Sequence, residues 1–152
     1  MIDTLPLPST EDLTDAPFWQ AALRSQLAIQ RCDHCNRMRF PPRLRCSSCQ
    51  SVQSHWHVLS GSATVWSYAT PRPPLLPAFE KIAPYFVVLA QMDEDPLIRI
   101  VGNLAFEDGQ LVTGLKPVGL KIGAPLRVCF RLCAPDVALP CWILAATSPK
   151  GS

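Results

Sequence analysis

The chain has 152 residues and a formal net charge of +2 at pH 7, and 48% of its residues are hydrophobic. This length accommodates one ordinary core, or a small metal-stabilised module beside a domain of about 100 residues. No apolar run reaches the roughly 20 residues of a membrane-spanning helix, so we expect no membrane span. Sixteen prolines argue against a bundle of long helices, because proline breaks helix interiors.

The N-terminal segment 1–30 is predicted to contain one amphipathic helix, over residues 16–28. Asp15 can cap this helix, and Pro17 is tolerated in its first turn. Its apolar positions gather on one side: Phe18, Trp19, Leu23 and Leu27. A helix this short is marginal alone, so its apolar face should dock on another domain or on a partner chain. The predicted partner-interface residues are Phe18, Trp19 and Leu23.

Segment 31–57 contains two Cys-x-x-Cys knuckles separated by ten residues. They are Cys32-Asp33-His34-Cys35 and Cys46-Ser47-Ser48-Cys49. This spacing places four thiolates at the corners of a tetrahedron, which is the closed coordination shell of a structural Zn²⁺. We predict that Cys32, Cys35, Cys46 and Cys49 bind a metal that holds the chain together and does not catalyse.

The four cysteines have two other interpretations. Mononuclear iron accepts the same soft tetrahedral ligands as zinc. Disulfides are disfavoured because the chain opens Met-Ile-Asp-Thr-Leu without a leader segment, which predicts a reducing, cytoplasmic location. His34 and His55 are near enough in sequence to compete as metal ligands, but four cysteines already close the shell.

Positive charge is concentrated in the same segment. Asp33 is its one acidic residue, against five basic ones: Arg31, Arg37, Arg39, Arg43 and Arg45. A partner or ligand with phosphates or carboxylates would be drawn there. A solvated surface with no ligand is the alternative interpretation.

Segment 58–152 shows the alternation typical of β-strands. The expected strands are 58–69 with a bend near Gly61, 85–92, 97–104, 125–132 and 141–146. Residues 71–77 form a proline-rich loop, and the acidic turn 93–96 makes a hairpin of the second and third strands. A long first strand, a hairpin and an irregular insert before the fourth strand fit a five-stranded Greek-key barrel of the OB type. The predicted fold is therefore mainly β: an N-terminal helix, a four-cysteine zinc ribbon and an OB-fold barrel.

Two alternative functions follow from residues of the barrel. Trp66 and Tyr68 share one face of the first strand, and OB barrels hold single-stranded nucleic acid by stacking bases on such aromatics. Nucleic acid is disfavoured as a partner, because the barrel segment lacks the basic excess that its binding requires.

The second alternative is acyl transfer through a thiol outside the knuckles, with three candidates: Cys129, Cys133 and Cys141. Arginines alternate with two of them in the fourth strand, and a neighbouring arginine lowers the pKa of a thiol. No histidine or acid stands at a spacing that suggests a base, so these cysteines are expected to pack as small hydrophobes.

The order of these features resembles the domain of unknown function 35 family. The matching pieces span nearly the whole chain: Phe18-Trp19, the two knuckles, Arg39-Phe40-Pro41-Pro42-Arg43, the strand from Gly61 to Tyr68, Pro84-Tyr85-Phe86, Leu120-Lys121-Ile122-Gly123-Ala124-Pro125 and Leu139-Pro140. The resemblance implies a rubredoxin-like zinc ribbon fused to an acyl-CoA-associated OB-fold domain.

The same resemblance implies a non-catalytic accessory subunit in a hetero-oligomer. Its expected partner is a thiolase-like enzyme, such as a lipid-transfer-type aldolase of steroid breakdown or an acyltransferase, or a MaoC-like enoyl-CoA hydratase. The chain would contribute interface and part of an acyl-CoA site. Coenzyme A carries phosphates that guanidinium groups bind bidentately, so the expected phosphate-binding residues are Arg37, Arg39, Arg43 and Arg45.

Overall fold

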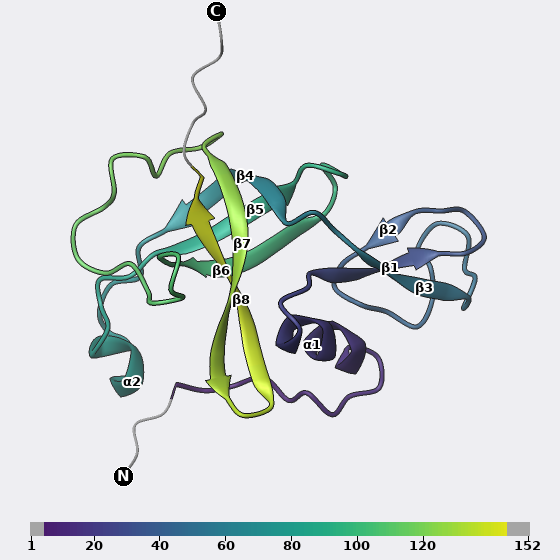
Figure 1. Ribbon diagram of the computed structural model, residues 1–152, viewed down its shortest axis with the longest axis horizontal. Coiled ribbons are helices and arrows are strands. Elements are labelled where there is room, and N and C mark those ends of the chain that lie inside the picture. Colours follow the sequence, from purple (N-terminus) through teal and green to yellow (C-terminus); the bar gives the residue numbers. More distant parts are fainter. Residues whose placement is uncertain (1–4, 146–152) are drawn as a thin grey trace, which may run out of the picture.

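Two β-structures lie side by side in the computed structural model, which describes residues 5–145. Figure 1 shows a small three-stranded sheet next to a closed barrel, with helix α1 (Ala16–Leu23) between them. The helix contacts β1 (Ala28–Cys32) of the small sheet and both β7 (Pro125–Ala134) and β8 (Val137–Leu144) of the barrel. No helix within residues 5–145 is long and apolar enough to cross a membrane.

The small sheet carries the knuckles. Its strands run antiparallel in the order β2 (Met38–Arg39), β1 and β3 (Ser54–Val58). The pairing of β1 with β3 extends from Ala28 opposite Val58 to Cys32 opposite Ser54. The first knuckle therefore starts at the end of a strand that is paired on both sides.

The helix is shorter than the predicted span of 16–28. The Arg24 amide donates to the carbonyls of Ala21 and Ala22, and Ser25 takes a positive φ of 57°, so the helix ends at Leu23. Leu27 is buried as predicted, at 2% exposed, but it is not helical. It lies just before the first residue of β1. Pairing of β1 with β3 overrides the helical periodicity there, since tertiary context routinely outweighs local propensity.

The predicted five-stranded OB barrel is confirmed. Its strand order is β4 (Ser62–Ala69), β5 (Val87–Met92), β6 (Arg99–Leu104), β8 and β7, and β7 pairs again with β4 to close the barrel. Strands β6 and β8 are parallel, and every other neighbouring pair is antiparallel. This order is the Greek-key arrangement that the irregular insert before the fourth strand predicted.

Several element boundaries differ from prediction: β5 begins at residue 87 instead of 85, β6 at 99 instead of 97, and β7 ends at 134 instead of 132. The expected strand 58–69 is two strands, because Gly61 takes a φ of +84° between β3 and β4. The last strand begins at Val137, four residues before the expected 141, because the β7–β8 hairpin extends as far as the pair Ala134 and Val137. Residue 146 of the expected last strand lies outside the described residues. A short helix that was not predicted, α2 (Pro77–Glu80), follows the proline-rich loop.

One hydrophobic core joins the two β-structures. Its largest fully buried member is Trp142, and barrel side chains such as Phe86 and Ile100 surround it. Phe18 of α1 and Ile29 of β1 belong to the same buried cluster. Helix α1 thus fixes the position of the ribbon against the barrel.

We predict that Gly61→Ala destabilises the protein by about 2–4 kcal/mol, because an alanine Cβ there would lie 2.5 Å from Val128 Cγ1 and would also be strained by the positive φ. The matched control is Gly114→Ala, where φ is +87° but nothing lies within 4 Å of an added Cβ. It should cost only about 1 kcal/mol. Urea unfolding monitored by tryptophan fluorescence measures both, and equal losses would contradict the role of the close approach.

Candidate metal centre and neighbouring grooves

The four knuckle cysteines converge at one end of the small sheet. Their Sγ atoms all lie within 4.8 Å of one another, and the pairs Cys32–Cys49 and Cys35–Cys46 are 3.6 Å apart. A tetrahedron with Zn–S bonds of about 2.3 Å has edges of about 3.8 Å, so the four sulfurs fit this ion. A disulfide requires about 2.05 Å, which these distances exclude for the two pairs.

Backbone amides prepare the sulfurs for a metal. The amides of Cys49 and Ser48 donate to Cys46 and lower the pKa of its thiol to about 6. In the first knuckle the Cys35 amide lowers the pKa of Cys32 in the same way. Since only the thiolate binds a metal, these hydrogen bonds favour the ligand form of Cys32 and Cys46, whereas burial and hydrogen bonds to the other cluster thiols raise the pKa of Cys49 to about 12.

Neither histidine that competed with the cysteines joins the cluster. Of the described residues, only the four cysteines make up the potential metal site. His55 Nδ1 lies 2.6 Å from Asp33 Oδ1, and His34 is exposed. Four sulfurs close the coordination shell and leave no position for a substrate, so the centre fits a structural zinc.

Arg39 holds the loop between the knuckles from inside. It is 8% exposed, and its Nε donates to Gln30 Oε1 at 2.8 Å. Its second terminal nitrogen donates to the Arg43 carbonyl and to Ser54 Oγ, both at 3.1 Å. Gln30 Oε1 also accepts the Arg43 amide at 2.8 Å. Most of the hydrogen bonds that this guanidinium can donate are therefore used within the ribbon.

Three of the four predicted phosphate-binding arginines line one groove. It has a volume of about 490 Å³ and lies between the knuckle loop and the turn that precedes β6. Arg37 and Arg43 are its exposed cations, and Arg39 forms part of its wall. The fourth, Arg45, does not line the groove and instead approaches the Gln50 carbonyl at 3.4 Å. We call this the arginine groove.

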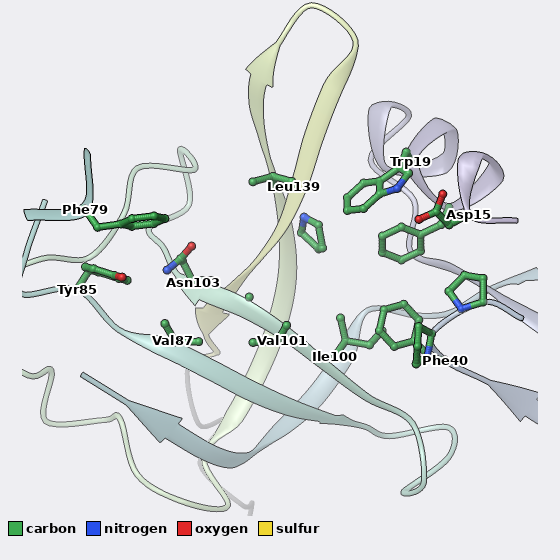
Figure 2. Close-up of a pocket in the computed structure, with 15 residues that line it drawn as sticks. Asp15, Trp19, Phe40, Phe79, Tyr85, Val87, Ile100, Val101, Asn103 and Leu139 are labelled. Atoms are coloured by element: carbon green, nitrogen blue, oxygen red, sulfur yellow. The ribbon is translucent and has the colours of Figure 1, made fainter. Parts of the chain in front are cut away.

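The loop between the two knuckles also lines a second hollow. This apolar cleft, of about 400 Å³, is shown in Figure 2. Helix α1 supplies Trp19 at one end, and Phe79 and Tyr85 stack at 5.8 Å between ring centroids at the other end. Phe40 and Pro41 line both the apolar cleft and the arginine groove. The two hollows thus share one wall.

The predicted interface residues have different environments. Phe18 is 4% exposed and packs against Trp19 and Phe40, at centroid distances of 4.9 and 5.4 Å. Trp19 is half-buried at the cleft, and Leu23 is 40% exposed. Only the last two therefore offer surface to another molecule.

Several cleft residues had no sequence signal. Asn103 and Leu139 come from β6 and β8, which meet only through the barrel register. Phe79 belongs to the unpredicted helix α2. Tyr85, at the same end of the cleft, did have a signal, since it belongs to Pro84-Tyr85-Phe86, one of the pieces of the family resemblance.

The residues behind the two alternative functions are already engaged within the chain. The Arg99 guanidinium lies 3.7 Å from the Trp66 ring centroid, and Lys116 Nζ donates to Tyr68 Oη at 2.9 Å and faces that ring. These cations occupy ring faces that a stacked base would need. All three histidines of the chain precede residue 58, so the barrel cysteines have no histidine base on their own segment.

We predict that Cys46→Ser lowers bound zinc from one ion per chain to below one-tenth, because serine is a poor ligand for zinc and Cys46 supplies one of four sulfurs. Metal analysis by mass spectrometry after dialysis measures zinc and iron together. Cys133→Ser, which removes a thiol outside the cluster, should keep the full zinc content. One iron per chain in the wild type would contradict a zinc centre.

Comparison with known proteins agrees with this geometry. Residues 19–53 match the family described as ChsH2, rubredoxin-like zinc ribbon domain, and residues 56–131 match ChsH2, C-terminal OB-fold domain. The solved structure of the Ltp2-ChsH2(DUF35) aldolase contains a similar chain, with 30% identity and a TM-score of 0.75, covering 91% of this chain and all of that one. A DUF35 protein of unknown function from Sulfolobus solfataricus shares the fold, at 15% identity and a TM-score of 0.53, over 77% of this chain and 78% of that one.

Two curated relatives are longer proteins. The probable enoyl-CoA hydratase alpha subunit of Thermomonospora curvata is 34% identical over 127 residues, which is 83% of this chain and 36% of the relative. The 3-oxo-4,17-pregnadiene-20-carboxyl-CoA hydratase alpha subunit of Mycobacterium tuberculosis is 29% identical over 147 residues, which is 97% of this chain and 41% of the relative. The chain therefore spans about two-fifths of these relatives. With both of its domains matched, the chain belongs to the ChsH2 family of zinc-ribbon and OB-fold proteins.

Proposed function

We propose that the chain is a non-catalytic accessory component of an enzyme assembly that acts on acyl-CoA substrates. The observation that carries this proposal is the match, over 91% of this chain, to a chain of the solved Ltp2-ChsH2(DUF35) aldolase. The two curated relatives, whose names describe alpha subunits of CoA-thioester hydratases, support the same class of assembly. The catalytic partner is then a thiolase-like aldolase or acyltransferase, or a MaoC-like hydratase.

The exposed part of helix α1 is the proposed contact with that partner. Trp19 and Leu23 present apolar surface, and Phe18 supports Trp19 from below through an edge-on ring contact. Tryptophan anchors at the centre of an apolar patch contribute strongly to protein interfaces. Because α1 also packs on the barrel, a partner bound to α1 would be held in a fixed orientation to the arginine groove and the apolar cleft.

The arginine groove is the proposed site for the phosphates of coenzyme A. Arg37 and Arg43 are exposed on a loop that the metal centre and Arg39 stiffen, so the backbone that carries their guanidinium groups is already ordered before a ligand binds. The acidic residue in the groove, Asp95, already accepts the Leu97 amide at 2.9 Å within its own turn. Its single carboxylate is outnumbered by the two exposed guanidinium groups of the groove.

The apolar cleft is the proposed path for the less polar part of the ligand. A coenzyme A molecule whose phosphates lie in the arginine groove can cross the shared wall of Phe40 and Pro41. Its acyl group would then lie against aromatic side chains at the proposed partner interface. In this arrangement the chain binds the ligand, and the partner supplies the groups that react with it.

We predict that the double variant Arg37→Ala/Arg43→Ala weakens acyl-CoA binding to the purified assembly by about 10- to 100-fold, or about 1.4–2.8 kcal/mol in total, because two charge-assisted hydrogen bonds are lost and solvent screens both exposed guanidinium groups. The experiment purifies the tagged chain from its native host, identifies the co-purified enzyme by mass spectrometry and titrates the complex with acyl-CoA by calorimetry.

The matched control is Arg45→Ala, which removes a charge from the same loop but outside the groove, and affinity should change less than threefold. Unchanged affinity in the double variant would contradict the arginine groove. Purification without any thiolase-like or hydratase chain, or with nucleic acid in its place, would contradict the accessory function itself.

A further inference from the structure

Two cysteines outside the metal cluster lie directly opposite each other in the β7–β8 hairpin. Cys129 on β7 and Cys141 on β8 are partners in the antiparallel register. Directly opposed residues place their side chains on one face, with Cβ atoms about 4.5–5.5 Å apart. A disulfide needs Cα atoms about 4.4–6.8 Å apart, which both kinds of antiparallel pair satisfy, and Cβ atoms about 3.5–4.5 Å apart, which opposed pairs reach at the short end of their range. The two thiols can therefore be joined without a change of register.

The two thiols differ in exposure and acidity. Cys141 is 2% exposed, whereas Cys129 is only partly buried. A hydrogen bond from Cys141 lowers the pKa of the Cys129 thiol, and the positive charge of Arg127 lowers it further. The same hydrogen bond and burial raise the pKa of Cys141. Cys129 is thus the thiol that ionises first and that solvent reaches, which is the combination that makes a cysteine react with oxidants.

The third barrel cysteine does not share this arrangement. The ladder between β7 and β8 shifts between Leu132 and Ala134, so Cys133 has no directly opposed residue. Its Sγ lies 3.5 Å from the Arg131 carbonyl. Cys133 is therefore a control for the pair, on the same strand and in the same sequence neighbourhood.

We propose that Cys129 and Cys141 form an oxidant-responsive thiol pair, with Cys129 as the attacked thiol and Cys141 as the resolving thiol. The oxidant class is a hydroperoxide, for example hydrogen peroxide. The proposal does not rest on the proposed acyl-CoA function. It is also distinct from the metal cluster, whose four sulfurs are the knuckle cysteines.

The chemistry balances in two steps. The Cys129 thiolate attacks one peroxide oxygen, the O–O bond breaks, and the leaving hydroxide takes a proton to become water, which leaves a sulfenic acid. Cys141 loses its proton and its sulfur attacks the sulfenic sulfur, the S–O bond breaks, and hydroxide leaves as a second water. Two thiols are oxidised to one disulfide, and one peroxide is reduced to two waters.

The disulfide would have a structural consequence at the apolar cleft. Cys141 directly follows Leu139 and Pro140, which line that cleft. A covalent link across the hairpin would fix this part of β8 against β7. Oxidation therefore acts on the cleft wall through the strand that forms it.

The test is a peptide map of the metal-loaded wild-type chain after exposure to a small excess of hydrogen peroxide and alkylation of free thiols. Trypsin cuts after Arg127 and Arg131, and a protease that cuts before Asp136 separates Cys133 from Cys141. We expect peptide 128–131 linked to peptide 136–150, about 2 Da lighter than the sum of the two reduced peptides.

Two variants test the assigned roles. Cys133→Ser should form the same link to the same extent. Cys141→Ser should instead accumulate a sulfenic acid at Cys129 that dimedone traps, because the resolving thiol is gone. The proposal is overturned if the wild type keeps Cys129 reduced or as a persistent sulfenic acid, if the link involves Cys133, or if the knuckle cysteines are oxidised before Cys129.

Discussion

The convergence of four thiolates on one point is the constraint on which the rest of the structure depends. The ribbon has too few residues to bury a core of its own, and small modules of this kind fold through their metal. The two knuckles fix both ends of the loop between residues 36 and 45. Arg39 then secures the middle of that loop through Gln30, and Phe40 packs on Phe18 of helix α1. The position of the loop against the barrel, and so of both hollows, follows from these contacts.

Phe40 and Pro41 form a wall that the arginine groove and the apolar cleft share, so one ligand can extend into both. One side of the wall carries exposed cations, and the other side is lined by aromatic rings and prolines. A ligand with an anionic end and an apolar end matches this division, and acyl-CoA is a ligand of that kind. The metal therefore serves the proposed function at a distance, by holding the wall and the arginines and not by touching the substrate.

Much of the fold was predictable because its signals are local. The Cys-x-x-Cys spacing predicted the metal cluster, and the alternation of apolar residues predicted the five-stranded barrel. The C-terminal end of α1 was not predictable, because Leu27 keeps a helical spacing while strand pairing decides its conformation. Burial of Arg39 depends on Gln30, a partner on another strand, and the pairing of Cys129 with Cys141 depends on hairpin register. Such features require contacts between segments that no single window of sequence contains.

This chain is proposed to assist acyl-CoA chemistry without performing it. The most direct measurement is turnover of acyl-CoA substrates by the chain alone, by its co-purified enzyme alone, and by the two together at equal concentration. We expect no turnover by the chain alone, and a kcat/KM for the mixture at least tenfold above that of the enzyme alone, which corresponds to about 1.4 kcal/mol. Turnover by the isolated chain, or equal rates for the enzyme with and without it, would contradict the proposed accessory function.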